Sequence, residues 1–219
     1  MKKTLLTICL FIIFLPLWGN VVPYPFSQYN FTYLNNDVGL PHNFVDDITK
    51  DSQDYIWIAT HNGLVRYDGY KYAIFNTETT PITLKSNYIH KICEDNYNRL
   101  WVASEGGIDI INLNKYQKVE LDLKENYVLE RMMHSNISSI YKDKKGDIWI
   151  SSDNTLFCLE LDGSGDIMEF YTLEENTSKR PILAVHDLGW AICAGINSSL
   201  VRIDKRKNNL LKVTPVSKS

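Results

Sequence analysis

Residues Gly39 to Asn76 read GLPHNFVDDITKDSQDYIWIATHNGLVRYDGYKYAIFN, and this stretch decides the fold. It contains four short runs of apolar and aromatic residues, which are Phe44–Ile48, Tyr55–Ala59, Leu64–Tyr67 and Tyr72–Phe75. Runs of this length that are rich in Val, Ile, Tyr and Trp and bounded by Asn, Asp and Gly are typical of β-strands. Asp68-Gly69 is a dipeptide that tight hairpins prefer, because both central residues of the turn adopt positive φ. The stretch is therefore predicted to form a meander of four antiparallel strands.

The same pattern recurs along the chain. A tryptophan marks the second strand of each copy, at Trp57, Trp101, Trp149 and, in a weaker fourth copy, Trp190. An aspartate lies six residues before each of the first three tryptophans, at Asp51, Asp95 and Asp143. A period of about 40–50 residues with four strands per unit is typical of β-propeller blades. One blade cannot bury both faces of its sheet, so it is stable only when neighbouring blades cover it.

The predicted fold is therefore all-β, with propeller blades of four antiparallel strands. About four blades fit within residues 29–219, at approximately 39–80, 83–124, 133–173 and 180–214. The recurrence of tryptophan at one position of the repeat favours a structural role in the core between blades. A platform for stacking a sugar ring is the alternative, but a single binding site would not need four equivalents.

The N-terminal residues are predicted to direct export. Lys2 and Lys3 precede the apolar segment Thr4–Leu15, as in a signal peptide that ends near residue 19. The apolar stretch is shorter than the roughly 20 residues that span a bilayer, although an uncleaved membrane anchor remains an alternative. Residues 20–28 contain two prolines and are predicted to be an extended linker. We expect a periplasmic location.

The first copy resembles the two-component regulator propeller repeat. The resemblance rests on Asp51, Trp57-Ile58-Ala59-Thr60, Gly63-Leu64 and Arg66-Tyr67-Asp68-Gly69, and on the opening Gly39–Val45. The second copy has Gly106-Gly107-Ile108 in place of Asn62-Gly63-Leu64, and the third has Asn154 in place of the glycine. This repeat builds the periplasmic sensor region of hybrid two-component systems in gut Bacteroidetes and related bacteria, which are histidine kinases.

The resemblance implies a larger ring, typically of seven blades. We therefore expect this chain to be an N-terminal fragment that forms part of a ring, with a compact four-blade propeller as the alternative. The expected partners are the remaining blades and the kinase-bearing parts of a parent sensor. Self-association is a further expectation, because open blade edges have unpaired strand groups that pair with other chains.

Candidate ligand residues lie in two sets of loops, those that precede the first strand of each blade and those between its second and third strands. These loops share one face of a propeller, which we call the top face. The candidates are Asn43, His61, Asn62, Asn87, Glu105, Asn136 and Asp153. Amide and carboxylate groups suit sugar hydroxyls because they offer both donors and acceptors. The resemblance implies that the ligand is an oligosaccharide derived from a glycan.

Other chemistry has little support in the sequence. The aspartates of the repeat lack the ligand spacing of an EF-hand and are expected to accept backbone N–H groups in the turns. The histidines show no zinc-binding spacing and no nucleophile elbow is present, so we expect no metal, cofactor or catalytic residue. Cys93, Cys158 and Cys193 form no C-x-x-C motif and are expected to be small buried apolar residues.

The predicted function is that of an extracytoplasmic sensor segment without catalytic activity of its own. Two alternatives remain, an exported polysaccharide lyase or glycosidase, and a truncated remnant without function. A net charge of −3 and a pI near 6.0 exclude the basic surface of a nucleic-acid-binding protein.

Overall fold

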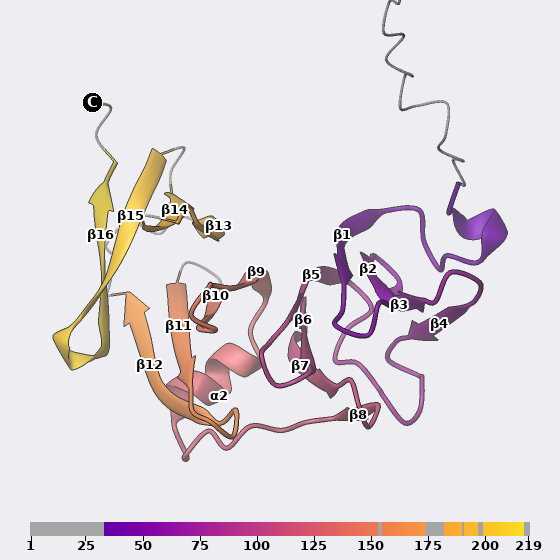
Figure 1. Ribbon diagram of the computed structural model, residues 1–219, viewed down its shortest axis with the longest axis horizontal. Coiled ribbons are helices and arrows are strands. Elements are labelled where there is room, and N and C mark those ends of the chain that lie inside the picture. Colours follow the sequence, from indigo (N-terminus) through magenta and orange to yellow (C-terminus); the bar gives the residue numbers. More distant parts are fainter. Residues whose placement is uncertain (1–32, 153–154, 174–181, 190, 197–198, 217–219) are drawn as a thin grey trace, which may run out of the picture. The chain divides into compact units, whose positions relative to one another are not determined.

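The computed structural model describes residues 33–152, 155–173, 182–189, 191–196 and 199–216 (Figure 1). The chain divides into two units, Met1–Tyr33 and Leu34–Ser219, and the elements described below all lie in the second. The predicted signal peptide, the linker, Asp153 and Trp190 lie outside the described residues. In the described part of the chain, no helix combines the length and the apolar character that crossing a membrane requires.

The described part of the chain is built almost entirely from β-strands, which confirms the all-β prediction. Blade 1 is a four-stranded antiparallel sheet in the order β1 (Val45–Lys50), β2 (Ile56–Thr60), β3 (Gly63–Tyr67) and β4 (Tyr72–Phe75). Blade 2 repeats this order with β5 (Ile89–Glu94), β6 (Arg99–Ser104), β7 (Gly107–Asn112) and β8 (Gln117–Lys118). Among the described residues, three short helices accompany the strands, which are η2 (Asn36–Val38), α2 (Tyr127–Met133) and η3 (Lys207–Asn209).

The remaining eight strands form a single sheet that contains blades 3 and 4. Blade 3 consists of β9 (Ile137–Lys142), β10 (Ile148–Ser152), β11 (Thr155–Leu161) and β12 (Ile167–Leu173), and blade 4 of β13 (Ile182–Asp187), β14 (Ile192–Ile196), β15 (Ser199–Arg206) and β16 (Leu210–Pro215). Each blade is an antiparallel meander, but their outermost strands pair in parallel at Thr172–Leu210 and Leu173–Leu211. This parallel join between two blades was not predicted.

Three hydrophobic cores hold successive blades together, and each is made from the same two kinds of face. Trp57, Ala59 and Leu64 of blade 1 pack against blade 2, whose contribution includes Ile89 and Ile92. Equivalent residues build the cores between blades 2 and 3 and between blades 3 and 4. We call the tryptophan side of a blade its forward face and the Ile/Val side its rear face. At each of the three junctions, the forward face of one blade thus packs on the rear face of the next.

A short helix completes the core between blades 2 and 3. The outermost strand of blade 2, β8, has only two residues, and α2 follows it in the chain. The side chain of Asn126 caps the helix by accepting from the backbone N–H groups of Val128 and Leu129. Leu129 and Met132 are buried in the same core as Trp101. The helix therefore supplies apolar cover that the short strand does not.

The fourth blade departs from the sequence alignment. In the paired strands, Trp57 lies opposite Thr49 and Trp101 opposite Cys93, and the same position in blade 4 is the pair His186–Cys193. Cys193 therefore occupies the tryptophan position, whereas Trp190 precedes the first residue of β14. The alignment of the fourth copy on Trp190 is wrong by three residues, because a smaller apolar residue has replaced the indole that the alignment relied on.

Two blade faces have no neighbouring blade within the described residues. Ile48 on the rear face of blade 1 is 61% exposed, whereas the equivalent Ile92 is only 4% exposed. Leu200 on the forward face of blade 4 is 48% exposed, whereas the equivalent Leu64 is fully buried. These apolar side chains occupy positions that the repeat elsewhere buries in a junction.

Candidate functional site

Aromatic and imidazole rings gather on the top face at blades 1 and 2. His42, Phe44 and His61 stack on one another, with ring centroids 5.2–5.5 Å apart. Tyr88, which precedes β5, meets His61 edge to face at 4.1 Å and His90 at 4.7 Å. Two blades therefore contribute to one group of rings. Together with Asp46 these residues form what we call the aromatic–histidine cluster.

Asp46 links the two blades within this cluster. Its carboxylate lies 3.1 Å from Nε2 of His61 and 3.8 Å from Nδ1 of His90. All three side chains are partly exposed, between 20% and 34%. Nε2 of His90 is buried and has no hydrogen-bond partner among the described residues. The cluster thus keeps a polar atom whose hydrogen-bonding capacity is unused.

Register shifts in two strands set the direction of two of these side chains. The pairing of β1 with β2 shifts register between Val45 and Asp47, and that of β5 with β6 shifts between Ile89 and Lys91. A bulge of this kind re-aims the extra residue, and bulges are common next to functional sites. The extra residues are Asp46 and His90, which face each other across the first junction. The same irregularity in both blades therefore builds the polar part of the cluster.

The cluster has the surface of a ligand platform. Phe44 is 65% exposed although it is a large apolar residue, and its ring contacts those of His42 and His61. Exposed ring faces bind flat apolar groups, and imidazole and carboxylate groups donate or accept hydrogen bonds beside them. Hydrolysis of a glycosidic bond uses a pair of carboxyl groups. Here the neighbouring Asp47 is directed elsewhere, because it accepts from the backbone N–H of Ile92.

The predicted ligand residues are distributed around this cluster rather than gathered in it. Of the seven, His61 is a member. Asn43 and Asn87 hold loops together, because their Oδ1 atoms accept from the backbone N–H groups of Asn36 and Thr77. Asn62 donates weakly to the carbonyl of Pro41 at 3.4 Å.

Two further candidates have exposed side chains with no hydrogen bond to described residues, namely Glu105 and Asn136. Asp153 lies outside the described residues. The role of all seven in ligand binding stays a prediction.

Sequence reasoning missed most of the cluster. His42, Phe44 and Asp46 alternate along the chain, as do Tyr88 and His90. Alternate residues of an extended segment point to one side, so this spacing was a usable signal. What the sequence did not reveal is that the two segments meet, because this requires blades 1 and 2 to be packed together.

A tryptophan–aspartate pair recurs in blades 1, 2 and 3. Its aspartate directly follows the innermost strand, at the other end of that strand from the aromatic–histidine cluster. The indole N–H groups of Trp57, Trp101 and Trp149 donate to the aspartates six residues earlier, at 2.7, 2.9 and 3.0 Å. The second oxygen of each aspartate accepts two backbone N–H groups of its turn. The three indoles are at most 2% exposed. They have no free ring face for a ligand.

The described residues contain no group of His, Cys, Asp and Glu that could hold a metal ion. Cys93, Cys158 and Cys193 are free thiols. Burial raises the pKa of Cys93 to about 12 and also raises the pKa of the other two thiols. A protonated buried thiol is a poor nucleophile and a poor metal ligand. These cysteines therefore contribute packing.

Three segments of the chain match a known family of repeats. Residues 39–62, 83–106 and 132–154 match the sequence profile described as "Two component regulator propeller". Each match contains the first two strands of blade 1, 2 or 3 in full, together with the tryptophan–aspartate pair of that blade. No curated protein matches the chain at the level of sequence.

Several solved structures share the fold at low sequence identity. The extracellular domain of BT3049 from B. thetaiotaomicron, described as a hybrid two component system, has a TM-score of 0.52 and 15% identity over 84% of this chain and 34% of that domain. Virginiamycin B lyase from Staphylococcus aureus has a TM-score of 0.55 and 17% identity over 83% of this chain and 58% of the lyase. The WD40 propeller domain of Doa1 has a TM-score of 0.53 and 17% identity over 77% of this chain and 54% of that chain. The present chain thus spans about a third of the BT3049 domain.

Proposed function

We propose that this chain, which carries three two component regulator propeller repeats, is a ligand-recognising segment of an extracytoplasmic sensor. The match of three blades to that repeat carries the proposal. On this proposal the chain acts in the periplasm and has no catalytic activity of its own. It would pass a binding signal to the kinase-bearing parts of a parent protein, because signalling domains are not encoded in the propeller itself.

The proposed ligand is an oligosaccharide derived from a glycan, bound at the aromatic–histidine cluster. The stack of His42, Phe44 and His61 offers ring faces against which the apolar face of a sugar can lie. Asp46 and His90 supply hydrogen-bonding groups beside that stack. Asn62, Glu105 and Asn136 lie in top-face loops and are proposed to extend the contact to further sugar units.

The proposed partners are further blades of the parent sensor. The exposed apolar residues Ile48 and Leu200 support this, because their equivalents in the other blades are covered by a neighbouring blade. The length of the BT3049 domain, of which this chain matches 34%, is also consistent with a larger assembly. A parent ring would bury both faces in junctions of the type already present three times.

Calorimetric titration of the purified chain with a panel of glycan-derived oligosaccharides tests the ligand. We expect Phe44→Ala and His61→Ala to weaken binding at least about tenfold, which corresponds to about 1.4 kcal/mol. Tyr70→Ala is the matched control, since Tyr70 is 92% exposed and belongs to the β3–β4 hairpin outside the cluster. Equal affinity of the wild type and both cluster variants would reject the cluster as the site.

The same preparation distinguishes the other functions. Release of smaller sugars during incubation would show an exported lyase or glycosidase, and would overturn the assignment as a non-catalytic segment. A chain without a cooperative thermal transition would be a remnant that does not fold. A folded chain that binds none of the oligosaccharides would remove the sugar ligand from the proposal while leaving the propeller fold intact.

A further inference from the structure

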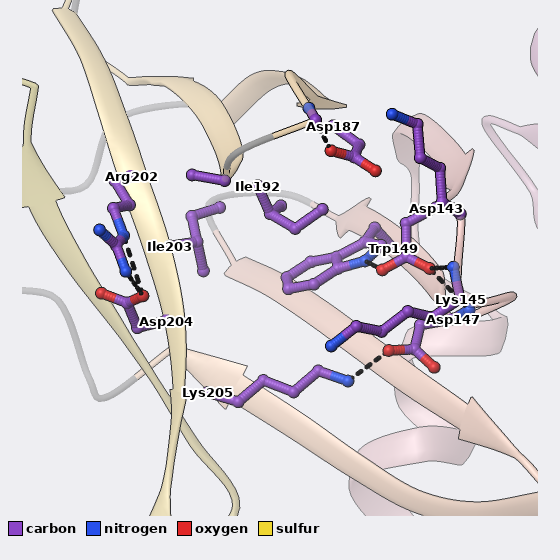
Figure 2. Close-up of a pocket in the computed structure, with 13 residues that line it drawn as sticks. Asp143, Lys145, Asp147, Trp149, Asp187, Ile192, Arg202, Ile203, Asp204 and Lys205 are labelled. Atoms are coloured by element: carbon purple, nitrogen blue, oxygen red, sulfur yellow. Dashed lines mark hydrogen bonds and ion pairs between the residues drawn. The ribbon is translucent and has the colours of Figure 1, made fainter.

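The three internal junctions pair side chains of different size in the same way. Each core contains the indole of one forward face and an aliphatic residue at a fixed position in the third strand of the next blade. The pairs are Trp57 with Ile111, Trp101 with Leu159, and Trp149 with Ile203. Figure 2 shows the third of these junctions, where Trp149 lies beside Ile203. A large ring on one face is therefore matched by a smaller side chain on the other.

The forward face of blade 4 lacks this large ring. Cys193 occupies the position of the indole. Gly195 occupies the position of Ala59 in blade 1, and no described atom lies within 4 Å of a Cβ added to it. Leu200, directly opposite Gly195 on the next strand, is largely exposed. The open face of blade 4 therefore has small side chains where the other blades have larger ones.

The rear face of blade 1 departs from the repeat in the opposite direction. Tyr67 occupies the position that an aliphatic residue holds in blades 2, 3 and 4. Its ring stacks on that of Tyr72 in the neighbouring strand, with the centroids 4.8 Å apart, and both side chains are only partly buried. Alternate residues of a strand share a face, so Tyr67 lies on the same side as Val65 and the exposed Ile48. This face therefore carries extra volume where the internal junctions meet an indole.

The two open faces are complementary in size. An indole placed against Tyr67 would bring two large rings to one position, and overpacking of this kind is destabilising. An aliphatic residue placed against Cys193 would leave a cavity, which also costs stability. Tyr67 placed against Cys193 avoids both. The dense packing of protein interiors therefore favours these two faces as partners for each other.

A charged residue on blade 4 adds to this match. In the first junction, the guanidinium group of Arg66 lies 4.5 Å from the ring centroid of Tyr116, which belongs to the turn between β7 and β8 of the next blade. Arg202, which pairs with Asp204, occupies the position of Arg66 on blade 4 and is half-exposed. Tyr70 lies in the turn between β3 and β4 of blade 1 and is largely exposed. Arg202 of one chain and Tyr70 of another can therefore form the same cation–π contact.

We propose that two copies of this chain associate head to tail, with the forward face of blade 4 in each copy against the rear face of blade 1 in the other. The exposure of Ile48 and Leu200 shows that these faces do not meet within one chain. Two identical contacts close a ring of eight blades, which lies within the range of four to eight blades typical of propellers. The second copy then supplies the neighbours that further blades of a parent sensor would otherwise supply, and a third copy finds no open face.

Analytical ultracentrifugation of the full chain tests the proposal, because it distinguishes a closed dimer from growth into longer assemblies. We expect monomer and dimer, with no larger species at any concentration. Cys193→Trp should weaken the dimer at least about tenfold, because the new indole meets Tyr67 of the other copy. The fold accommodates this change, since Trp57 lies opposite Arg66 in blade 1 just as Cys193 lies opposite Arg202 in blade 4.

A double variant makes the test specific to the match in size. Tyr67→Ile alone should also weaken the dimer, because it leaves a gap beside Cys193. Cys193→Trp/Tyr67→Ile recreates the pairing of an indole with an aliphatic residue and should restore the affinity of the wild type. Tyr127→Ile is the control, since Tyr127 is an exposed tyrosine of α2, outside both faces, and its loss should leave the dimer unchanged.

A cooperative thermal transition in each variant separates loss of association from loss of folding. A folded wild-type chain that stays monomeric at every concentration would overturn the proposal and leave the open faces to blades of a longer parent. Species that grow beyond the dimer would overturn the closed ring. A double variant that associates no more tightly than either single variant would show that Cys193 and Tyr67 do not meet.

Discussion

The aspartate that accepts the indole N–H is expected to contribute more to the free energy of unfolding in blade 2 than in blade 1. In blade 2 it also forms an ion pair with an arginine. Asp95 accepts from Trp101 and from Nε of Arg99 at 2.7 Å, and the side chains of both ion-pair partners are at most 7% exposed. Removing one partner of a buried ion pair leaves the other charge without compensation. Asp95→Ala is therefore expected to lower the free energy of unfolding by about 3–5 kcal/mol.

Blade 1 offers the matched comparison. Asp51 accepts from Trp57 in the same way, but the residue equivalent to Arg99 is Tyr55, so no buried charge is released. Asp51→Ala should leave hydrogen-bond donors without an acceptor but no charge without a partner. We expect it to lower the free energy of unfolding by about 1–3 kcal/mol. Urea-induced unfolding of both variants measures the difference. Equal losses would mean that the arginine contributes nothing to the turn.

The cysteine thiols provide a second test at the scale of single residues. A thiol reacts with iodoacetamide as its thiolate, and a pKa of about 12 for Cys93 leaves only about one molecule in ten thousand ionised at pH 8. Because the pKa is raised, the thiol of the folded chain keeps its proton as the pH rises past the ordinary value of about 8.5. We expect no alkylation of Cys93 at pH 8 in the native chain and rapid alkylation in urea. Mass spectrometry of peptides containing Cys93 distinguishes the two.

At the scale of elements, the glycine that opens β7 holds blade 2 against the end of α2. Gly107 has a φ of 118°, and a Cβ at this position would collide with the carbonyl oxygen of Met133. Gly107→Ala should therefore destabilise the fold by about 1–3 kcal/mol through backbone strain, with the collision adding to it. Gly163→Ala is the control, because nothing lies within 4 Å of its added Cβ. Thermal unfolding that is unchanged in both variants would contradict this close approach.

The sequence predicts elements well where a local pattern specifies them. The strands of blade 1 were recognisable as short apolar and aromatic runs bounded by turn residues, and the spacing of aspartate and tryptophan marked the next two copies. The helix α2 was not predicted, since seven residues are too few to show a helical period. The pairing of β12 with β16 was not predicted either, because it joins residues about 40 positions apart whose sequences contain no sign of each other.

The candidate site was likewise predicted only in part from the sequence. His61 was predicted from its place in a loop, whereas Asp46 and His90 depend on two bulges and on the packing of two blades. The fourth blade could not be aligned correctly, because Cys193 has replaced the tryptophan that marks the other copies. Features within one blade could therefore be predicted from the sequence, whereas contacts between blades could not.

At the scale of the whole molecule, the decisive feature is that the outer faces of blades 1 and 4 have no neighbouring blade among the described residues. Val45 and Ile48 on the rear face of blade 1 are 37% and 61% exposed, and Leu200 on the forward face of blade 4 is 48% exposed. Apolar residues in these positions are buried in each of the three internal junctions. A forward face and a rear face that fit each other within one chain can also fit between two chains.

The isolated chain is therefore expected to self-associate. Size-exclusion chromatography with light scattering should show a mass that rises with concentration, and Ile48→Lys should shift it toward the monomer, because a charge on an exposed position opposes contact without a folding cost. The comparison is Ile92→Lys, at the equivalent buried position of blade 2, which should unfold the chain since its 4% exposure leaves the ammonium group without water. A compact monomer at every concentration, with Ile48→Lys unchanged, would mean that the open faces of blades 1 and 4 do not bind each other. The further blades of a parent sensor would then have to recognise these faces by contacts other than the repeated junction.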